Sequence, residues 1–205
     1  MNESILFIDC SANPFIVGIL NAKHEWEMFF KSEKNQDFFS LLYNVLREKN
    51  KKLNQFKQVI VCMGPGSYSG LRQSFLFSEV LRLEKEKIFS FYHSEFLKIV
   101  SSYTHKQLSY YVAYAFKNSF YVENLSLNIK GQFVATENLA DWLVGKAGFA
   151  GKAHELFSHL KTFENIDHLY FQYPELLINI MVPESMKQRP VDYFRPAELE
   201  FPNFK

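Results

Sequence analysis

The first half of the chain carries short apolar runs separated by polar or turn-forming residues. Runs of this length are typical of β-strands and are too short for ordinary helices. The first three of them predict strands at residues 5–8, 15–20 and 26–30. Because the connections between these runs are short, we expect the strands to form an antiparallel meander.

Helical spacing of apolar residues begins after the third strand. A helix is predicted from Phe38 onward, with Asn35 or Asp37 as its N-cap. The next predicted elements are a strand at 59–63, a helix at 69–85 and a strand at 88–91. Strands joined through helices are normally parallel, so residues 1–92 predict an α/β domain with a mixed sheet.

The second half is less regular, and we expect a reduced α/β domain over residues 103–205, with the boundary near residues 93–106. Its tail contains Pro190, Pro196 and Pro202, which predicts an extended chain. The stretch 176–181 is either helical or extended. The other predicted elements are a helix at 94–102, a hairpin at 110–116 and 120–127, and helices at 136–144 and 152–160.

The composition of the chain indicates what kind of protein it is and which partners it can attract. The chain has 205 residues, 47% of them hydrophobic and 22% charged, with a formal net charge of +1. These values exclude wholesale disorder and give no strong electrostatic attraction to nucleic acid or to a membrane. Two cysteines cannot form a disulfide framework, and the N-terminus does not resemble a signal peptide. We therefore expect a cytoplasmic protein.

A glycine-rich turn, GPGSYSG at residues 64–70, lies between a predicted buried strand and a helix. Such a turn can aim backbone N–H groups at a phosphate. It lacks the Lys of a phosphate-binding P-loop, and its spacing differs from the dinucleotide fingerprint. The alternative is a tight turn whose glycines permit positive φ and close packing. The sequence leaves both interpretations open.

Several segments carry a family resemblance. The opening ILFIDCS resembles the strand ILxIDTS of the TsaB (YeaZ) family, and MGPGSYSGLR at residues 63–72 closely resembles its GPGSFTGLR signature. PVDYFR at 190–195 is similar to the PxYLR near the end of the family, and residues 149–151 match a GxG strand end. The chain departs from the family at 114–117, YAFK, where an Asp-Ala-Arg segment is usual, and at Cys10, where Thr is usual.

The resemblance implies an actin/hsp70-like (ribonuclease H-like) fold and a non-catalytic role. TsaB supports the catalytic subunit TsaD in making threonylcarbamoyladenosine on bacterial tRNA, together with a TsaE-type ATPase. The resemblance also implies that the chain forms a homodimer when it is alone and contacts tRNA only through the complex. No membrane partner is expected. No tightly bound cofactor and no metal are then expected here, since ATP and metal belong to the partner subunits.

The first two helices carry more apolar surface than one sheet can cover. On the second helix we expect Leu76, Phe77, Val80 and Leu83 to face the sheet. Small residues four positions apart on the other side would permit close approach of another helix. The predicted partner interface consists of Phe39, Tyr43, Leu46, Leu71, Ser74, Phe75 and Ser78. The alternative is that the second domain or a loop covers these residues.

Asp9 is the leading candidate for chemistry because it ends a buried strand. A small ATP-dependent kinase or phosphatase of the same superfold would use it with the glycine turn, and would contact nucleotide or another anion through Asp9, Ser11, Gly64 and Gly66. A lone carboxylate at such a place more often binds the N–H groups of a nearby turn. His154 and His159 have the wrong spacing for a metal pair on one helix face.

Overall fold

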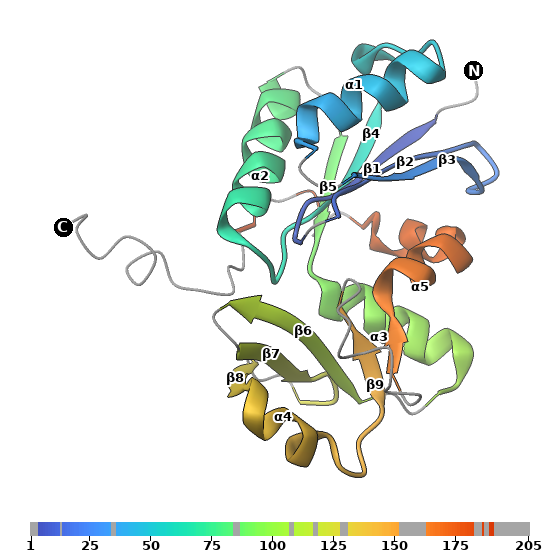
Figure 1. Cartoon of the computed structure of the whole chain (residues 1–205). Helices are drawn as coiled ribbons and strands as arrows, with labels where there is room; N and C mark the ends of the chain where they lie inside the picture. The colour runs from blue at the N-terminus through green and yellow to red at the C-terminus, as the bar shows by residue number, and fades with distance from the viewer. Residues whose placement is uncertain are drawn as a thin grey trace, which may run out of the picture. The chain divides into compact units, whose positions relative to one another are not determined.

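A computed structural model describes residues 4–12, 14–33, 36–83, 87–106, 109–116, 119–127, 131–151, 163–182, 186 and 189–190. Figure 1 shows its helices and strands. Contacts within the chain divide it into two units. The first unit comprises Met1–His93 with Pro174–Tyr193, and the second comprises Ser94–Tyr173 with Phe194–Lys205.

The first unit is built on a five-stranded mixed sheet in the order β3-β2-β1-β4-β5. β1 pairs antiparallel with β2, and β2 with β3, which confirms the predicted meander. β1, β4 and β5 run parallel to one another. The strands are β1 (Ile5–Asp9), β2 (Ile16–Leu20), β3 (Trp26–Lys31), β4 (Gln58–Cys62) and β5 (Lys87–Phe91).

Two helices, α1 (Phe38–Glu48) and α2 (Tyr68–Leu83), cover one face of this sheet (Figure 1). Leu6 and Ile8 of β1 point toward them and pack with Phe77 of α2 in one buried cluster. On α1 the buried side is the predicted stripe of Phe38, Leu41, Leu42 and Val45. Burying such a stripe, more than helix propensity, stabilises a helix of this length.

Aromatic side chains of β1, β3 and β5 pack together on the opposite face of the sheet. Phe7 lies between Leu6 and Ile8 in β1, so its side chain points the other way. Its ring centroid is 5.7 Å from that of Trp26 and 6.2 Å from that of Phe91. Asp9 follows on the same side by the same alternation.

The second unit repeats this strand order. Its sheet runs β8-β7-β6-β9-β10, with β6–β7 and β7–β8 antiparallel and β6–β9 and β9–β10 parallel. The pairing of β6 with β7 confirms the predicted hairpin. The strands are β6 (Tyr110–Phe116), β7 (Ser119–Asn124), β8 (Gln132–Ala135), β9 (Gly148–Ala150) and β10 (Phe163–Asn165).

The remaining helices are α3 (His93–Thr104), α4 (Thr136–Leu143) and α5 (Ile166–Gln172), with 3-10 turns η1 (Leu53–Gln55) and η3 (Pro174–Ile180). The structure confirms the predicted helices at 94–102 and 136–144. It places 176–180, most of the undecided stretch, in the 3-10 turn η3. The predicted helix at 152–160 and residues 191–205 lie outside the described residues. No helix in the described segments is both long and apolar enough to cross a membrane.

The division into units differs from the expected second domain, 103–205, at two places. Helix α3 groups with the second unit from Ser94 onward, where the ring centroid of Phe96 lies 4.8 Å from that of Tyr170 in α5. The turn Pro174–Ile180 groups with the first unit, where it contacts β5. The chain therefore returns to its first unit near the end, which no local pattern in the sequence indicates.

Helix α1 begins at the predicted cap, Asp37. The hydroxyl of Ser40 donates to Asp37 Oδ2 at 2.6 Å, and the Ser40 backbone N–H donates to Oδ1 at 3.0 Å. These bonds, the hydroxyl bond foremost, hold the pKa of Asp37 below its ordinary value of 3.8. A carboxylate at this position also interacts favourably with the positive end of the helix dipole.

Replacing Asp37 with Ala should lower the melting temperature at neutral pH because the cap is lost. Since the folded pKa lies below the unfolded value, the stabilisation is present above pH 3.8 and is lost as pH falls through the lowered pKa. In thermal unfolding, the difference in melting temperature between D37A and the natural chain should become smaller as the pH falls into the acid range. Asn44→Ala, on the exposed side of the same helix, is the control. A gap that stays constant with pH would contradict this account.

Candidate functional site

Three polar side chains meet where parallel strands of the first sheet end. Asp9 is the last residue of β1, Cys62 is the last residue of β4, and His93 comes two residues after β5. Ile8 pairs with Val61, so Asp9 and Cys62 come next on neighbouring strands. The carboxyl ends of parallel strands are where α/β proteins usually hold their ligands.

The three side chains are buried and close together. Asp9 and Cys62 have no exposed surface, and His93 is 2% exposed. Their ligand-type atoms all lie within 4.8 Å of one another. His93 Nε2 is 3.2 Å from Asp9 Oδ2 and 3.2 Å from Ser11 Oγ. The prediction that Asp9 binds turn N–H groups is confirmed, because the Ser11 N–H donates to its Oδ1 at 2.8 Å.

The glycine turn packs directly on the chain that follows β1. An added Cβ at Gly66 would lie 2.3 Å from the carbonyl oxygen of Ser11, and one at Gly70 would lie 2.0 Å from that of Cys10. The Ser67 N–H donates to the same Ser11 oxygen at 2.6 Å. Gly64 has a φ of 116°, which favours glycine. These contacts support the second interpretation of the glycine turn, a tight turn whose glycines permit close packing.

The predicted nucleotide contacts lie inside this packed region. Asp9, Ser11, Gly64 and Gly66 are all buried. The N–H of Ser67 already donates to Ser11, and the Gly70 N–H donates to Ser67 Oγ at 3.4 Å. The latter bond gives Ser67 the capping role that is usual for serine at the start of a helix.

An exposed apolar surface lies on α1 and α2. Phe39 and Tyr43 of α1 are 55% and 62% exposed. On α2, exposed apolar side chains recur at helical spacing: Leu76 at 51%, Val80 at 57% and Leu83 at 81%. Helices α1 and α2 are in contact where the ring centroids of Phe39 and Phe77 lie 6.4 Å apart. We call Phe39, Tyr43, Leu76, Val80 and Leu83 the apolar face.

The predicted orientation of α2 is wrong except at Phe77, which is buried in the core cluster with Leu6 and Ile8. Leu71, Ser74 and Ser78 were expected at a partner interface but are fully buried within the chain. Leu76, Val80 and Leu83 were expected to face the sheet but are exposed. The reason is Gly70, which brings its side of the helix against the backbone of Cys10. The small residues permit close approach, as predicted, but within the chain itself.

The other predicted interface residues divide in two. Phe39 and Tyr43 are exposed as an interface requires. Leu46 and Phe75 are partly buried and pack against the core of the first unit. Two of the three interface residues predicted on α1 are therefore exposed, whereas none of the four predicted on α2 is.

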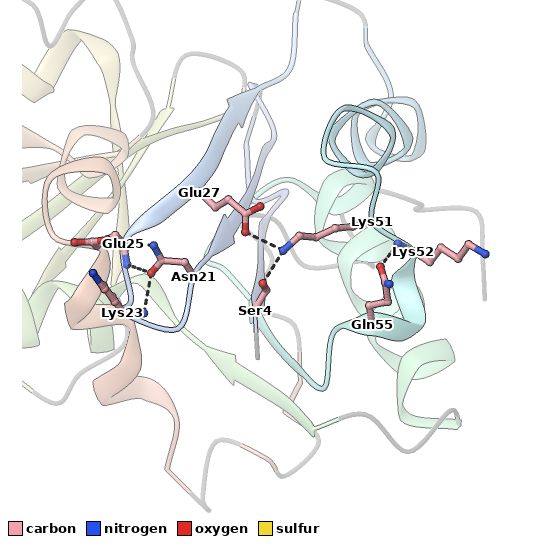
Figure 2. A network of polar contacts seen from close by, with 8 residues as sticks. All are labelled: Ser4, Asn21, Lys23, Glu25, Glu27, Lys51, Lys52 and Gln55. Atoms are coloured by element: carbon pink, nitrogen blue, oxygen red, sulfur yellow. Dashed lines mark hydrogen bonds and ion pairs between the residues drawn. The ribbon is translucent and has the colours of Figure 1, made fainter. Parts of the chain in front are cut away.

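A basic stretch at the end of α1 and after it contains Arg47, Lys49, Lys51, Lys52 and Lys57. One of these residues, Lys51, binds two other parts of the first unit. Its Nζ donates to Ser4 Oγ at 2.6 Å and to Glu27 Oε2 at 2.8 Å, which connects the start of β1 to β3 (Figure 2). The next residue, Lys52, donates its backbone N–H to Gln55 Oε1 at 2.7 Å (Figure 2). Lys51 thus has a structural role within this stretch.

Sequence reasoning missed Cys62 and His93 as site residues. They lie 53 and 84 positions from Asp9 in the sequence, so no short motif connects them. One signal was available: each comes at the end of a predicted parallel strand, as Asp9 does. His154 and His159, whose spacing argues against a metal pair, lie outside the described residues.

The fold resembles that of known structures. The first is YeaZ from Pseudomonas aeruginosa, with a TM-score of 0.53 and 12% identity, covering 87% of this chain and 90% of that one. The second is described as a protein with similarity to peptidase YeaZ from Pseudomonas aeruginosa. Its TM-score is 0.55 at 15% identity, and the match covers 94% of this chain and all of that one. No protein-family model and no curated protein sequence matches the chain. Each unit contains a mixed sheet with flanking helices, and the likeness to YeaZ confirms the predicted actin-like α/β fold class.

Proposed function

We propose that this chain is a TsaB-like scaffold subunit that docks a TsaD-type catalytic subunit through its apolar face. The complex would modify tRNA to N6-threonylcarbamoyladenosine, with a TsaE-type ATPase as a further partner and with tRNA bound only through the complex. The observation that carries the proposal is the apolar face itself, on a fold shared with YeaZ.

The spacing of the apolar face suits another helix. Leu76, Val80 and Leu83 follow one another at intervals of four and three residues, which places them along one line of α2. Side chains in such a line fill the grooves of a facing helix. Exposed apolar patches usually mark partner sites, and the exposed rings of Phe39 and Tyr43 on α1 suit an energetic hot spot.

Burial around Asp9 favours this proposal over a kinase or phosphatase. A phosphotransfer site needs a carboxylate and turn N–H groups that reach the substrate. Here Asp9 binds Ser11 and His93, and Gly66 packs on the Ser11 backbone. Substrate could approach only after this packing opened.

Co-expression with the TsaD-type subunit of the same cell tests the proposal. We expect the two chains to copurify and to give the mass of a heterodimer, while the chain alone gives a homodimer. The natural tRNA of a strain lacking this chain should also lose the modified base by mass spectrometry. Failure to copurify under native conditions, with the modification intact in the deletion strain, would overturn the proposal.

A further inference from the structure

The cluster at the strand ends contains a donor set that recurs in transition-metal sites. Asp9, Cys62 and His93 supply an oxygen, a sulfur and a nitrogen, all within 4.8 Å of one another. We propose that these three residues bind one Zn²⁺ ion.

The separation of the Asp9 and His93 ligand atoms fits tetrahedral coordination, and Cys62 Sγ lies within 4.8 Å of both. Zinc bonds of about 2.0 to 2.3 Å place neighbouring ligand atoms roughly 3.3 to 3.8 Å apart. Asp9 Oδ2 and His93 Nε2 are already 3.2 Å apart. Ser11 Oγ, at 3.2 Å from His93 Nε2, lies where a fourth oxygen ligand or a hydrogen-bond partner of a bound water belongs.

Contacts behind the ligand atoms hold them in place. The Ser11 N–H donates to Asp9 Oδ1 at 2.8 Å, which leaves Oδ2 directed at His93. The Gly64 N–H donates to Cys62 Sγ at 3.4 Å, and Sγ lies 3.9 Å from the Gly64 carbonyl oxygen, so the glycine turn fixes the position of the sulfur. The backbone N–H of His93 donates to the Gly64 carbonyl at 2.8 Å, which ties the histidine to the same turn. Supporting bonds of this kind orient metal ligands in proteins.

Charge and ligand type select the metal. A thiolate and a carboxylate together balance a divalent cation, so the buried site would carry no net charge, with His93 as a neutral ligand. Magnesium and calcium prefer all-oxygen sites, whereas zinc accepts sulfur and nitrogen together with oxygen. Zn²⁺ is therefore the divalent ion that this donor set fits best.

The second cysteine provides a matched control. Cys10 is as buried as Cys62, but it belongs to the core cluster on the α1 and α2 side of the sheet, together with Leu6 and Ile8. By strand alternation, Asp9 points to the opposite side. The proposed metal site is thus separate from the apolar face and does not rest on the docking role.

The test uses the full chain, stripped with a chelator, loaded with Zn²⁺ and desalted. Metal analysis should give about one zinc per chain for the natural protein and for C10S, and binding weaker by about tenfold or more for C62S and H93Q. Loss of zinc from C10S and C62S alike, or zinc retained at full affinity by C62S and H93Q, would overturn the proposal.

Cobalt provides a readout that needs no variant. Co²⁺ bound to the natural chain should give the intense near-ultraviolet band of a cobalt–thiolate bond and the visible bands of tetrahedral cobalt, and Zn²⁺ should displace both. Binding of Co²⁺ without a thiolate band would place the ion on other histidines, and no binding at all would remove the site. Either result would refute the proposal even if C62S failed to fold.

Discussion

Gly70→Ala is expected to destabilise the first unit by about 3 kcal/mol or more, because the added methyl group has no space. Its Cβ would lie 2.0 Å from the Cys10 carbonyl oxygen, which is backbone at the end of β1 and cannot rotate away. Helix α2 would have to move off the sheet, disturbing the buried residues beneath it. The melting temperature should fall by roughly 10 °C, measured by circular dichroism.

Gly18→Ala is the matched comparison. Its Cβ would also clash, at 2.3 Å, but with a ring atom of Trp26, a side chain that is only partly buried and can shift. We expect G18A to cost less than half as much as G70A. Ser69→Ala, an exposed neighbour of Gly70, should leave stability nearly unchanged. If G70A lowered the melting temperature no more than G18A does, the close contact between Gly70 and the Cys10 backbone would not stabilise the fold as we infer.

Placing two aspartates on the apolar face, Leu76→Asp with Val80→Asp, should weaken partner binding by about 100-fold or more. Both side chains are more than half exposed, at 51% and 57%, so the folded chain should lose little stability. In the complex, the same carboxylates would be taken out of water against apolar surface, which is costly without a compensating charge. Calorimetric titration with the TsaD-type subunit measures the loss of affinity, and sedimentation of the chain alone measures the loss of homodimer.

Val144→Asp controls for the added charge. Val144 is 75% exposed at the end of α4 in the second unit, so the substitution has the same chemistry at a different surface. It should leave association unchanged. If L76D with V80D bound the partner as well as V144D does, the apolar face would not be the docking surface, whatever else the chain binds.

The order of elements in the first unit was predictable because each strand there is a distinct apolar run. Residues 5–8 and 59–63 read as buried strands and form β1 and β4. In the second unit, β9 and β10 have three residues each, too few for a hydrophobic pattern to distinguish them from loops. The short helix α5 was missed as well. That both sheets share one strand order is visible only in three dimensions.

The orientation of α2 shows why helical periodicity alone was insufficient. Apolar side chains occur on several sides of this helix, among them Leu71, Phe77 and Val80. No single side then stands out as the buried one. The contact at Gly70 decides the matter, since only a residue without a side chain fits there.

By itself, the sequence determined the mixed α/β class, the start of α1 near Asn35 or Asp37, the position of the glycine turn and the placement of Asp9 at the end of a buried strand. These features depend on local chemistry: alternation, capping and backbone freedom. The tertiary structure alone decided which side of α2 is exposed and that Cys62 and His93 lie beside Asp9. Those features depend on which strands become neighbours, and residues 9, 62 and 93 meet because β1, β4 and β5 end at one edge of a parallel array.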